Sequence, residues 1–351
     1  MSALGAGRRW RVVRGAFRPR GVRWERLETG STNALWRGRA CGGDWLLKWY
    51  RYPEAGVHPE VEVAEFLCGQ RGVGVARFGG ALERQRGDGL WESVALVQGW
   101  VEGRGAWERM GEALREGRER VADAWALGRC VGEVHRALAS GEAGGAFGRD
   151  AWGTEDARAW SDSVLALGER LQEAVHGGAP EGVDGGGWTR LRSLWGAGDW
   201  RERARGLARL EVTGWKTRIH GDLHLGQILE QPGREPVIVD WEGEPLRPLE
   251  ERRRKELALR DVAGMWRSYA YAGAVFGAEA ERVGELQRAF VQGWRECVEL
   301  PGGDWLGVLE GMIWEKTIYE ALYELRHRPG WLGVPVQALE CPAGRGLAGL
   351  R

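Results

Sequence analysis

Strand-like and helix-like segments occupy different parts of this 351-residue chain. In the first hundred residues, short β-branched and aromatic runs alternate with turn residues such as Gly42-Gly43-Asp44, a pattern typical of antiparallel strands. A helix is expected over residues 59–70, because Pro59 suits a first helical turn and an apolar face follows it. The expected strands are Arg11–Ala16, Val22–Glu28, Ala34–Ala40, Trp45–Tyr50 and Ser93–Gln98.

After residue 103 the pattern changes to amphipathic helices joined by glycine-rich segments. A short strand pair, Thr217–His220 and Pro236–Asp240, lies among these helices. The expected helices cover residues 106–140, 153–175, 188–212, 250–275, 279–299 and 303–328.

This segregation predicts an α+β fold with two lobes. We expect a β-rich N-terminal lobe over residues 1–98 and a larger, mostly helical C-terminal lobe over residues 106–351. Residues 99–105, which contain three glycines, would form the hinge between them.

The charge balance excludes several kinds of partner. Fifty Lys and Arg residues oppose 50 Asp and Glu residues, so the formal net charge is zero and neither nucleic acid nor an anionic membrane is expected as a partner. Five scattered cysteines lack a C-x-x-C pair, which argues against a disulfide framework or a zinc site. Because the N-terminal stretch has no apolar signal-peptide core, and because no apolar run of about 18 residues occurs, we expect a cytoplasmic protein.

Two polar segments carry the strongest indication of chemistry. Residues 218–229 read RIHGDLHLGQIL, and residues 237–245 read VIVDWEGEP. Phosphoryl transfer from ATP needs a carboxylate beside the attacking hydroxyl, an amide oxygen on a metal, and a second carboxylate that holds Mg²⁺. Asp222, Gln227 and Asp240 have these side chains in this order, and Glu242 is a possible further metal ligand. The alternative is that these acids are ordinary turn and cap residues.

These segments resemble the aminoglycoside phosphotransferase-like kinases, and within them the maltokinases. The string HGDLHLGQIL…VDWEGEPLRPLEERR…LRDVAGMWRSYAY is similar to maltokinase sequences, as is WEKTIYEALYELRHRPGWL at residues 314–332. The resemblance implies a bilobal, protein-kinase-like fold, with ATP and Mg²⁺ as cofactors and phosphorylation of maltose to maltose 1-phosphate as the reaction. It also implies trehalose synthase as a conceivable partner.

The N-terminal lobe offers residues for ATP. Lys48, one of only four lysines against 46 arginines, lies on an apolar strand and would bind the α- and β-phosphates. A carboxylate from the following helix would pair with it; we expect Glu62, with Glu60 left open. The other expected nucleotide contacts are Gly30, Ser31, Thr32 and Asn33 on the phosphate side, and Gln98, Trp100 and Val101 at the hinge.

Aromatic, acidic and basic side chains suited to a sugar gather near the C-terminus. Tyr319 and Tyr323, like Glu320 and Glu324, are spaced i, i+4 and so share a face of a helix within residues 312–331. A purely structural helix would have the same spacing. His220 and His224 are also expected to organise the loop over residues 218–229, and of the two His224 is the better candidate for a sugar contact. The full set expected to touch the sugar comprises His220, His224, Tyr319, Glu320, Tyr323, Glu324, Arg328 and Trp331.

The sequence departs from the maltokinase pattern in two places. Only 29 residues precede Gly30, so the family's N-terminal cap segment is expected to be absent or replaced by strands. Tyr269-Ala270-Tyr271 lacks the acidic residue that the family has at its centre. Other acceptors therefore stay open, namely glucosamine, glucose or an aminoglycoside, as does a pseudokinase that only binds nucleotide.

Overall fold

The computed structural model describes residues 9–18, 20–29, 31–70, 72–244, 247–341 and 344–350. The chain divides into two compact units. The first contains the residues up to Ala106 together with residues 220–222 and 226–254, and the second contains the rest. The segments expected to carry the catalytic and metal-binding residues thus belong largely to the β-rich unit, although we placed them in the helical lobe.

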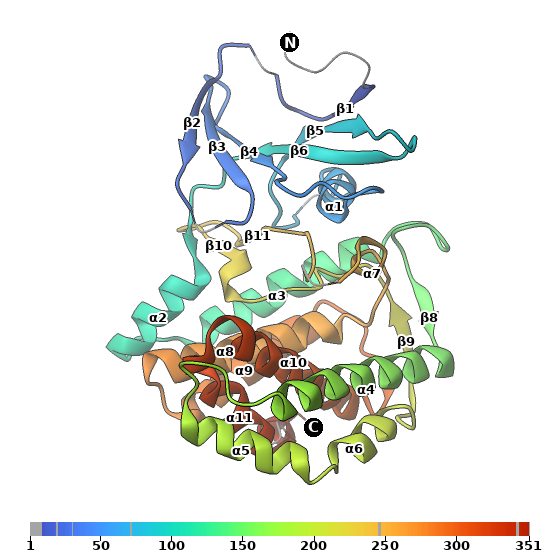
Figure 1. Ribbon diagram of the computed structural model, residues 1–351. Helices are drawn as coiled ribbons and strands as arrows, with labels where there is room; N and C mark the ends of the chain where they lie inside the picture. The colour runs from blue at the N-terminus through green and yellow to red at the C-terminus, as the bar shows by residue number, and fades with distance from the viewer. Residues whose placement is uncertain are drawn as a thin grey trace. The chain divides into compact units, whose positions relative to one another are not determined.

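A six-stranded antiparallel sheet dominates the described part of the first unit (Figure 1). Its order is β1-β5-β6-β4-β3-β2. The five expected strands are present within a few residues of their expected bounds, and β5 is a strand that the sequence reasoning missed. The strands are β1 (Trp10–Arg14), β2 (Arg23–Leu27), β3 (Ala34–Arg39), β4 (Trp45–Trp49), β5 (Phe78–Gln85) and β6 (Trp91–Gly99).

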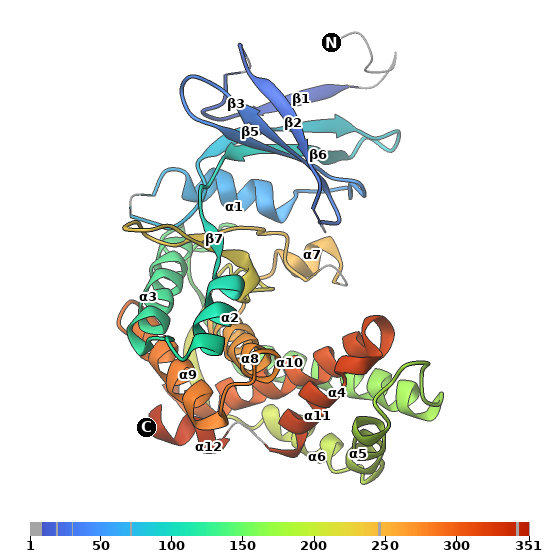
Figure 2. The same ribbon diagram turned by 90° about the vertical axis from the view of Figure 1, so that its left-hand side faces the viewer.

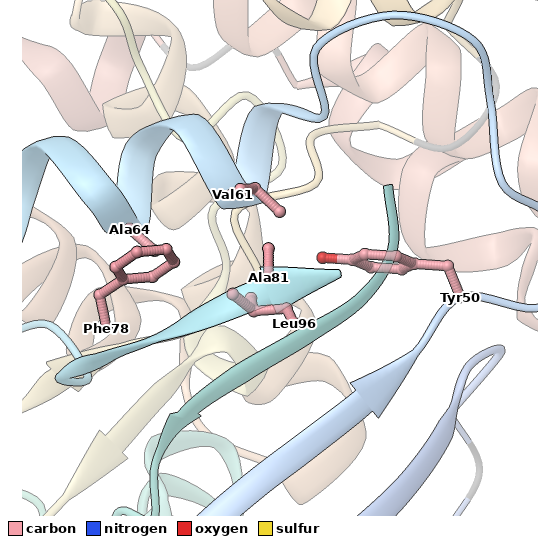
Figure 3. Packing of buried hydrophobic residues seen from close by; sticks show 6 residues of the cluster. All are labelled: Tyr50, Val61, Ala64, Phe78, Ala81 and Leu96. Carbon is pink, nitrogen blue, oxygen red and sulfur yellow. The ribbon is translucent and has the colours of Figure 1, made fainter. Parts of the chain in front are cut away.

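Helix α1 (Pro59–Leu67) packs on this sheet through a small apolar cluster (Figure 3). Val61 and Ala64 lie one helical turn apart and face strand residues. The helix begins at Pro59, as expected, and ends three residues before the expected position. The buried members of the cluster are Tyr50, Val61, Ala64, Phe78, Ala81 and Leu96.

A second, smaller sheet in the first unit has the order β11-β10-β7. Its strands are β7 (Arg104–Gly105), β10 (Ile228–Glu230) and β11 (Val237–Ile238), and α7 (Leu249–Arg252) follows. The expected pairing of Thr217–His220 with Pro236–Asp240 is wrong, because β11 pairs with β10 instead. Pro232 and Gly233 close this hairpin, so local turn chemistry decided the partner.

The second unit is mostly helical (Figure 2). A small sheet of order β12-β9-β8 accompanies the helices. Helices α3 and α9 lie side by side and approach closely, since a Cβ on Gly128 would collide with the backbone carbonyl of Phe290. The elements are α2 (Ala106–Glu116), α3 (Val121–Leu138), β8 (Asp150–Trp152), α4 (Thr154–His176), α5 (Gly185–Gly196), α6 (Trp200–Leu207), β9 (Val212–Lys216), α8 (Leu259–Phe276), α9 (Ala280–Arg295), β12 (Gly302–Gly303), α10 (Trp305–His327), α11 (Gly333–Glu340) and α12 (Gly344–Leu347).

Three of the expected helices are shorter or divided. The segments 106–140 and 188–212 each form two helices, and the segment 250–275 forms a short helix followed by α8. Within the described residues, no helix combines the length and the apolar character needed to span a membrane.

Candidate active site

A buried lysine surrounded by carboxylates forms the centre of the polar site in the first unit. Lys48, on β4, is 5% exposed. Its Nζ lies 3.0 Å from Oε2 of Glu60 and 2.5 Å from Oδ1 of Asp240, and it also contacts Glu242. Burial disfavours an ammonium group, but these three carboxylates outweigh burial and raise the pKa of Lys48. Lys48 is therefore a permanent positive charge.

Glu60, and not Glu62, is the α1 carboxylate that pairs with Lys48. The expectation for Glu62 is wrong, because Glu62 pairs with Arg253, whose Nη2 lies 2.8 Å from its Oε1. Positions i and i+2 on a helix point about 200° apart, so the two acids cannot both face the sheet. Burial raises the pKa of Glu60 to about 7, although Lys48 opposes this rise.

The expected metal ligands lie together beside Lys48. Carboxylate oxygens of Glu60, Asp240 and Glu242 all lie within 4.8 Å of one another. Nε2 of Gln227 donates a 3.2 Å hydrogen bond to Oδ2 of Asp240. Burial opposes ionisation of Asp240, yet the charge of Lys48 holds its pKa below the usual value. Ionised carboxylates and an amide oxygen are the donors that Mg²⁺ prefers, so this set fits a magnesium ion.

The backbone at Asp240 has an uncommon conformation. Among the described non-glycine residues, only Asp240 has a positive φ, at 64°. Asp tolerates this left-handed conformation better than most residues. Asp240 comes two residues after β11, and this local turn places its carboxylate beside Lys48.

His220 organises the loop that carries Asp222. Its Nε2 donates a 2.9 Å hydrogen bond to the carbonyl of Val239, and its Nδ1 accepts a 3.3 Å hydrogen bond from the amide of Asp222. His220 is 2% exposed, so the structure gives it a place inside the unit and not the expected contact with a sugar. Gly221 has a φ of 82°, which a side chain would strain. Asp222 itself is half-buried.

In the loop before β3, the side chain of Asn33 forms hydrogen bonds to other residues of the protein. Its Nδ2 donates a 2.7 Å hydrogen bond to Oε1 of Glu242, and its Oδ1 accepts one from the amide of Arg51. Asn33 is 9% exposed, so it holds a carboxylate in this structure and does not project from the loop. Ser31 and Thr32 as phosphate contacts stay a prediction, and Gly30 lies outside the described residues.

In the segment expected to form the hinge, the backbone amide of Trp100 donates a 2.9 Å hydrogen bond to the carbonyl of Asp44. This amide is therefore already used within the protein, and it is not available to donate a hydrogen bond to an adenine ring. Arg37 covers the indole of Trp100 at 4.3 Å from the ring centroid. Gln98 lies within β6 and is buried. Adenine contacts at Gln98 and Val101 stay a prediction.

Helix α10 places two of the expected sugar-binding acids in ion pairs within the second unit. Glu320 pairs with Arg267, whose side chain is 4% exposed, at 2.7 Å. Glu324 pairs with Arg328 at 2.6 Å and accepts a 3.1 Å hydrogen bond from the hydroxyl of Tyr271. The side chain of Glu324 is only 1% exposed. Both carboxylates are thus already neutralised by arginines.

The other expected sugar contacts in the second unit are more accessible. Tyr323 and Trp331 are each 37% exposed. Tyr319 and His224 are partly exposed, and the ammonium of Lys316 lies 4.7 Å from the Tyr319 ring. Their contact with a sugar stays a prediction.

Sequence reasoning missed one residue of the site, Tyr50. Its hydroxyl donates a 2.8 Å hydrogen bond to Oε2 of Glu60. A signal was present, because Tyr50 follows Lys48 by two residues, and side chains two apart on a strand share a face.

Comparisons with known proteins find curated relatives and similar folds. The chain is 30% identical over 224 residues to a protein named glucosamine kinase from Streptacidiphilus jiangxiensis, which covers 60% of this chain and 46% of the relative. It is 34% identical over 131 residues to a glucosamine kinase from Mycolicibacterium smegmatis strain ATCC 700084, covering 34% of this chain and 33% of that protein. The chain thus matches less than half the length of either relative.

Solved structures share the fold. A glucosamine kinase in complex with glucosamine, ADP and inorganic phosphate has a TM-score of 0.72 at 22% identity, covering 96% of this chain and 79% of the other. An amicoumacin kinase has a TM-score of 0.53 at 15% identity, covering 94% and 91%. These likenesses confirm the expected bilobal kinase-like fold class. The profile described as "Phosphotransferase enzyme family" matches residues 23–297, and this chain therefore belongs to that family.

Proposed function

We propose that the protein is an ATP-dependent kinase that phosphorylates a hydroxyl group of a small sugar. The cluster around Lys48 is the observation that carries this proposal. Phosphoryl transfer needs a cation for the phosphates and oxygen ligands for Mg²⁺, and Lys48 with Asp240 and Glu242 supplies both chemistries. Membership of the phosphotransferase family supports the same reaction type.

The proposal gives a role to each candidate site residue of the first unit. Lys48 binds the α- and β-phosphates, and Glu60 keeps its ammonium in place. Gln227, Asp240 and Glu242 would hold Mg²⁺, which would supply positive charge against the phosphates. Asp222 orients the acceptor hydroxyl and takes its proton. Direct in-line transfer needs no covalent enzyme intermediate.

Glucosamine is our first candidate for the acceptor. The two relatives named above both carry the name glucosamine kinase, which supports glucosamine over maltose as the acceptor. Maltose is the second candidate, on the resemblance of residues 314–332 to maltokinases, and trehalose synthase would be a partner only in that case. Charge does not separate the two sugars, since Glu320 and Glu324 already pair with arginines.

A coupled assay of ADP release with glucosamine, maltose, glucose and kanamycin tests the proposal. We expect the highest kcat/KM with glucosamine, with the phosphorylated sugar confirmed by mass spectrometry. An Asp222→Asn variant controls for contaminating kinases. If only maltose is turned over, maltose becomes the proposed acceptor in place of glucosamine. The absence of turnover with all four acceptors would contradict the proposal of a sugar kinase.

A further inference from the structure

The hydroxyl of Tyr50 links the apolar cluster beneath α1 to the Lys48–Glu60 ion pair. Tyr50 is 3% exposed, and its hydroxyl donates a 2.8 Å hydrogen bond to Oε2 of Glu60. The same oxygen lies 3.0 Å from Nζ of Lys48. Figure 3 shows the ring at the edge of the cluster, with its hydroxyl oxygen directed toward the other cluster residues. One carboxylate oxygen of Glu60 thus meets both a hydroxyl donor and an ammonium.

Packing holds the Tyr50 ring in one place. The imidazole of His58 stacks on it, with ring centroids 4.0 Å apart and an interplanar angle of 27°. The ring is a buried member of the apolar cluster, at the opposite end from Phe78 in Figure 3. A tyrosine ring has only two rotatable side-chain bonds, so a packed ring also fixes the position of its hydroxyl.

We propose that Tyr50 is a positioning residue for nucleotide binding, which acts by orienting Glu60 and, through it, the ammonium group of Lys48. This inference rests on the proposed function. Lys48 is a flexible chain that ends in a point charge, so its direction depends on its partners. Among its three carboxylates, Asp240 and Glu242 also fit a magnesium ion, which would draw them toward the metal. Glu60 is then the carboxylate that holds the ammonium group of Lys48 in position, and the hydroxyl of Tyr50 holds the carboxylate of Glu60 in position.

The variant Tyr50→Phe tests the inference, because it removes the hydroxyl and keeps the ring. We expect KM for ATP to rise about tenfold, as for the loss of one hydrogen bond to a charged group. The dissociation constant for ADP, measured by calorimetry in the presence of Mg²⁺, should rise by a similar factor. KM for the sugar and the melting temperature should change little. Tyr52→Phe is the matched control, since Tyr52 is 84% exposed, and it should behave as wild type.

A packing variant separates positioning from general stability. Phe78→Leu should lower the melting temperature and leave KM for ATP unchanged. The double variant Tyr50→Phe/Glu60→Gln should bind ADP no more weakly than Glu60→Gln alone, since the hydroxyl acts through Glu60. Unchanged ADP affinity in Tyr50→Phe, or an equal loss in Phe78→Leu, would overturn the inference.

The two proposals fail in different ways. A wild-type protein that binds ADP but turns over none of the sugars contradicts the proposed function, while the ADP affinity of Tyr50→Phe still decides the role of Tyr50. A wild-type protein that does not bind ADP overturns both.

Discussion

The side-chain amide of Asn33 donates a 2.7 Å hydrogen bond to the carboxylate of Glu242, which lies 209 residues further along the chain. Glu242 also contacts Lys48. The loop before β3 is thereby tied to the carboxylates that fit a metal ion. Asn33 therefore reaches the Lys48 cluster through Glu242, in addition to the phosphate contact that is predicted for its loop.

Removing this amide should weaken ATP binding. We expect Asn33→Ala to lower kcat/KM for ATP about tenfold, because Glu242 loses a charge-assisted hydrogen bond. Asn33→Asp has nearly the same shape but places a second carboxylate against Glu242, so its loss should be larger. Steady-state kinetics over a range of ATP concentrations measures both. Equal activity of Asn33→Asp and wild type would argue against the link.

Asp222 should control the chemical step and not ATP binding. Replacing a general base typically costs about 10²–10⁴ in rate, so we expect Asp222→Asn to lower kcat by at least about 100-fold. The affinity for ADP should stay within about twofold, since Asp222 is not among the carboxylates around Lys48. Asp162→Asn, an exposed acid on α4, is the control. An active Asp222→Asn protein would favour a scaffold that only binds nucleotide.

Lys48 should not tolerate arginine, even though arginine is the usual basic residue of this chain. The site is 5% exposed and holds a compact ammonium among three carboxylates, so a planar guanidinium does not fit the same contacts. We expect Lys48→Arg to raise KM for ATP at least about tenfold. Lys216→Arg, at a partly exposed ion pair with Asp156, should be neutral. Wild-type kinetics in Lys48→Arg would contradict the role of the buried ammonium.

His58 should make the folded protein sensitive to mild acid. Burial, with the charges of Lys48 and Arg252, lowers the pKa of His58 to about 3, against an ordinary value of 6.5. Between these two values the unfolded chain binds a proton that the folded protein does not, so stability falls as the pH falls below about 6.5. The slope is at most about 1.4 kcal/mol per pH unit.

Urea unfolding at a series of pH values between 5 and 8 measures the His58 effect. His58→Gln should flatten the decline below pH 6.5, whereas His176→Gln, at an exposed histidine, should leave it unchanged. An identical pH dependence in wild type and His58→Gln would show that folding does not lower the pKa of His58.

Replacing Glu320 should lower the stability of the folded protein and leave sugar binding unchanged. Glu320→Ala leaves Arg267 buried without its carboxylate, and breaking a buried ion pair costs about 3–5 kcal/mol. We therefore expect a lower free energy of unfolding, measured in urea, and an unchanged KM for the sugar. Glu173→Ala, at an exposed acid on α4, is the control. A raised KM for the sugar at unchanged stability would instead place Glu320 in the acceptor site.

Local sequence signals predicted much of the fold but missed β5. In the segment FGGALERQ, two glycines follow Phe78; glycine is uncommon in strands, so the alternation of the segment was hidden. The structure explains them: a Cβ on Gly79 would lie 2.7 Å from the carbonyl of Val97, and Gly80 has a φ of 140° at an irregularity in the pairing with β6. Glycine is needed at these two positions because of the neighbouring strands, and the local sequence does not show which strands will be neighbours.

The residues expected around the nucleotide show the same limit. Lys48, Gln227, Asp240 and Glu242 were expected from type and order, and the structure brings them together. His220 was expected at the sugar, but both of its ring nitrogens form hydrogen bonds within the first unit. The residue type indicated that His220 belongs to the site, but only the folded loop showed which groups its imidazole contacts.

The sequence by itself determined that a rare lysine on an apolar strand precedes a helix with two acids in its first turn. It left open which acid meets the lysine, because two residues along a helix turn the side chain about 200°. The tertiary structure decided this when Val61 and Ala64 packed into the apolar cluster. That packing sets the rotation of α1, which directs Glu60 to Lys48 and leaves Glu62 to Arg253.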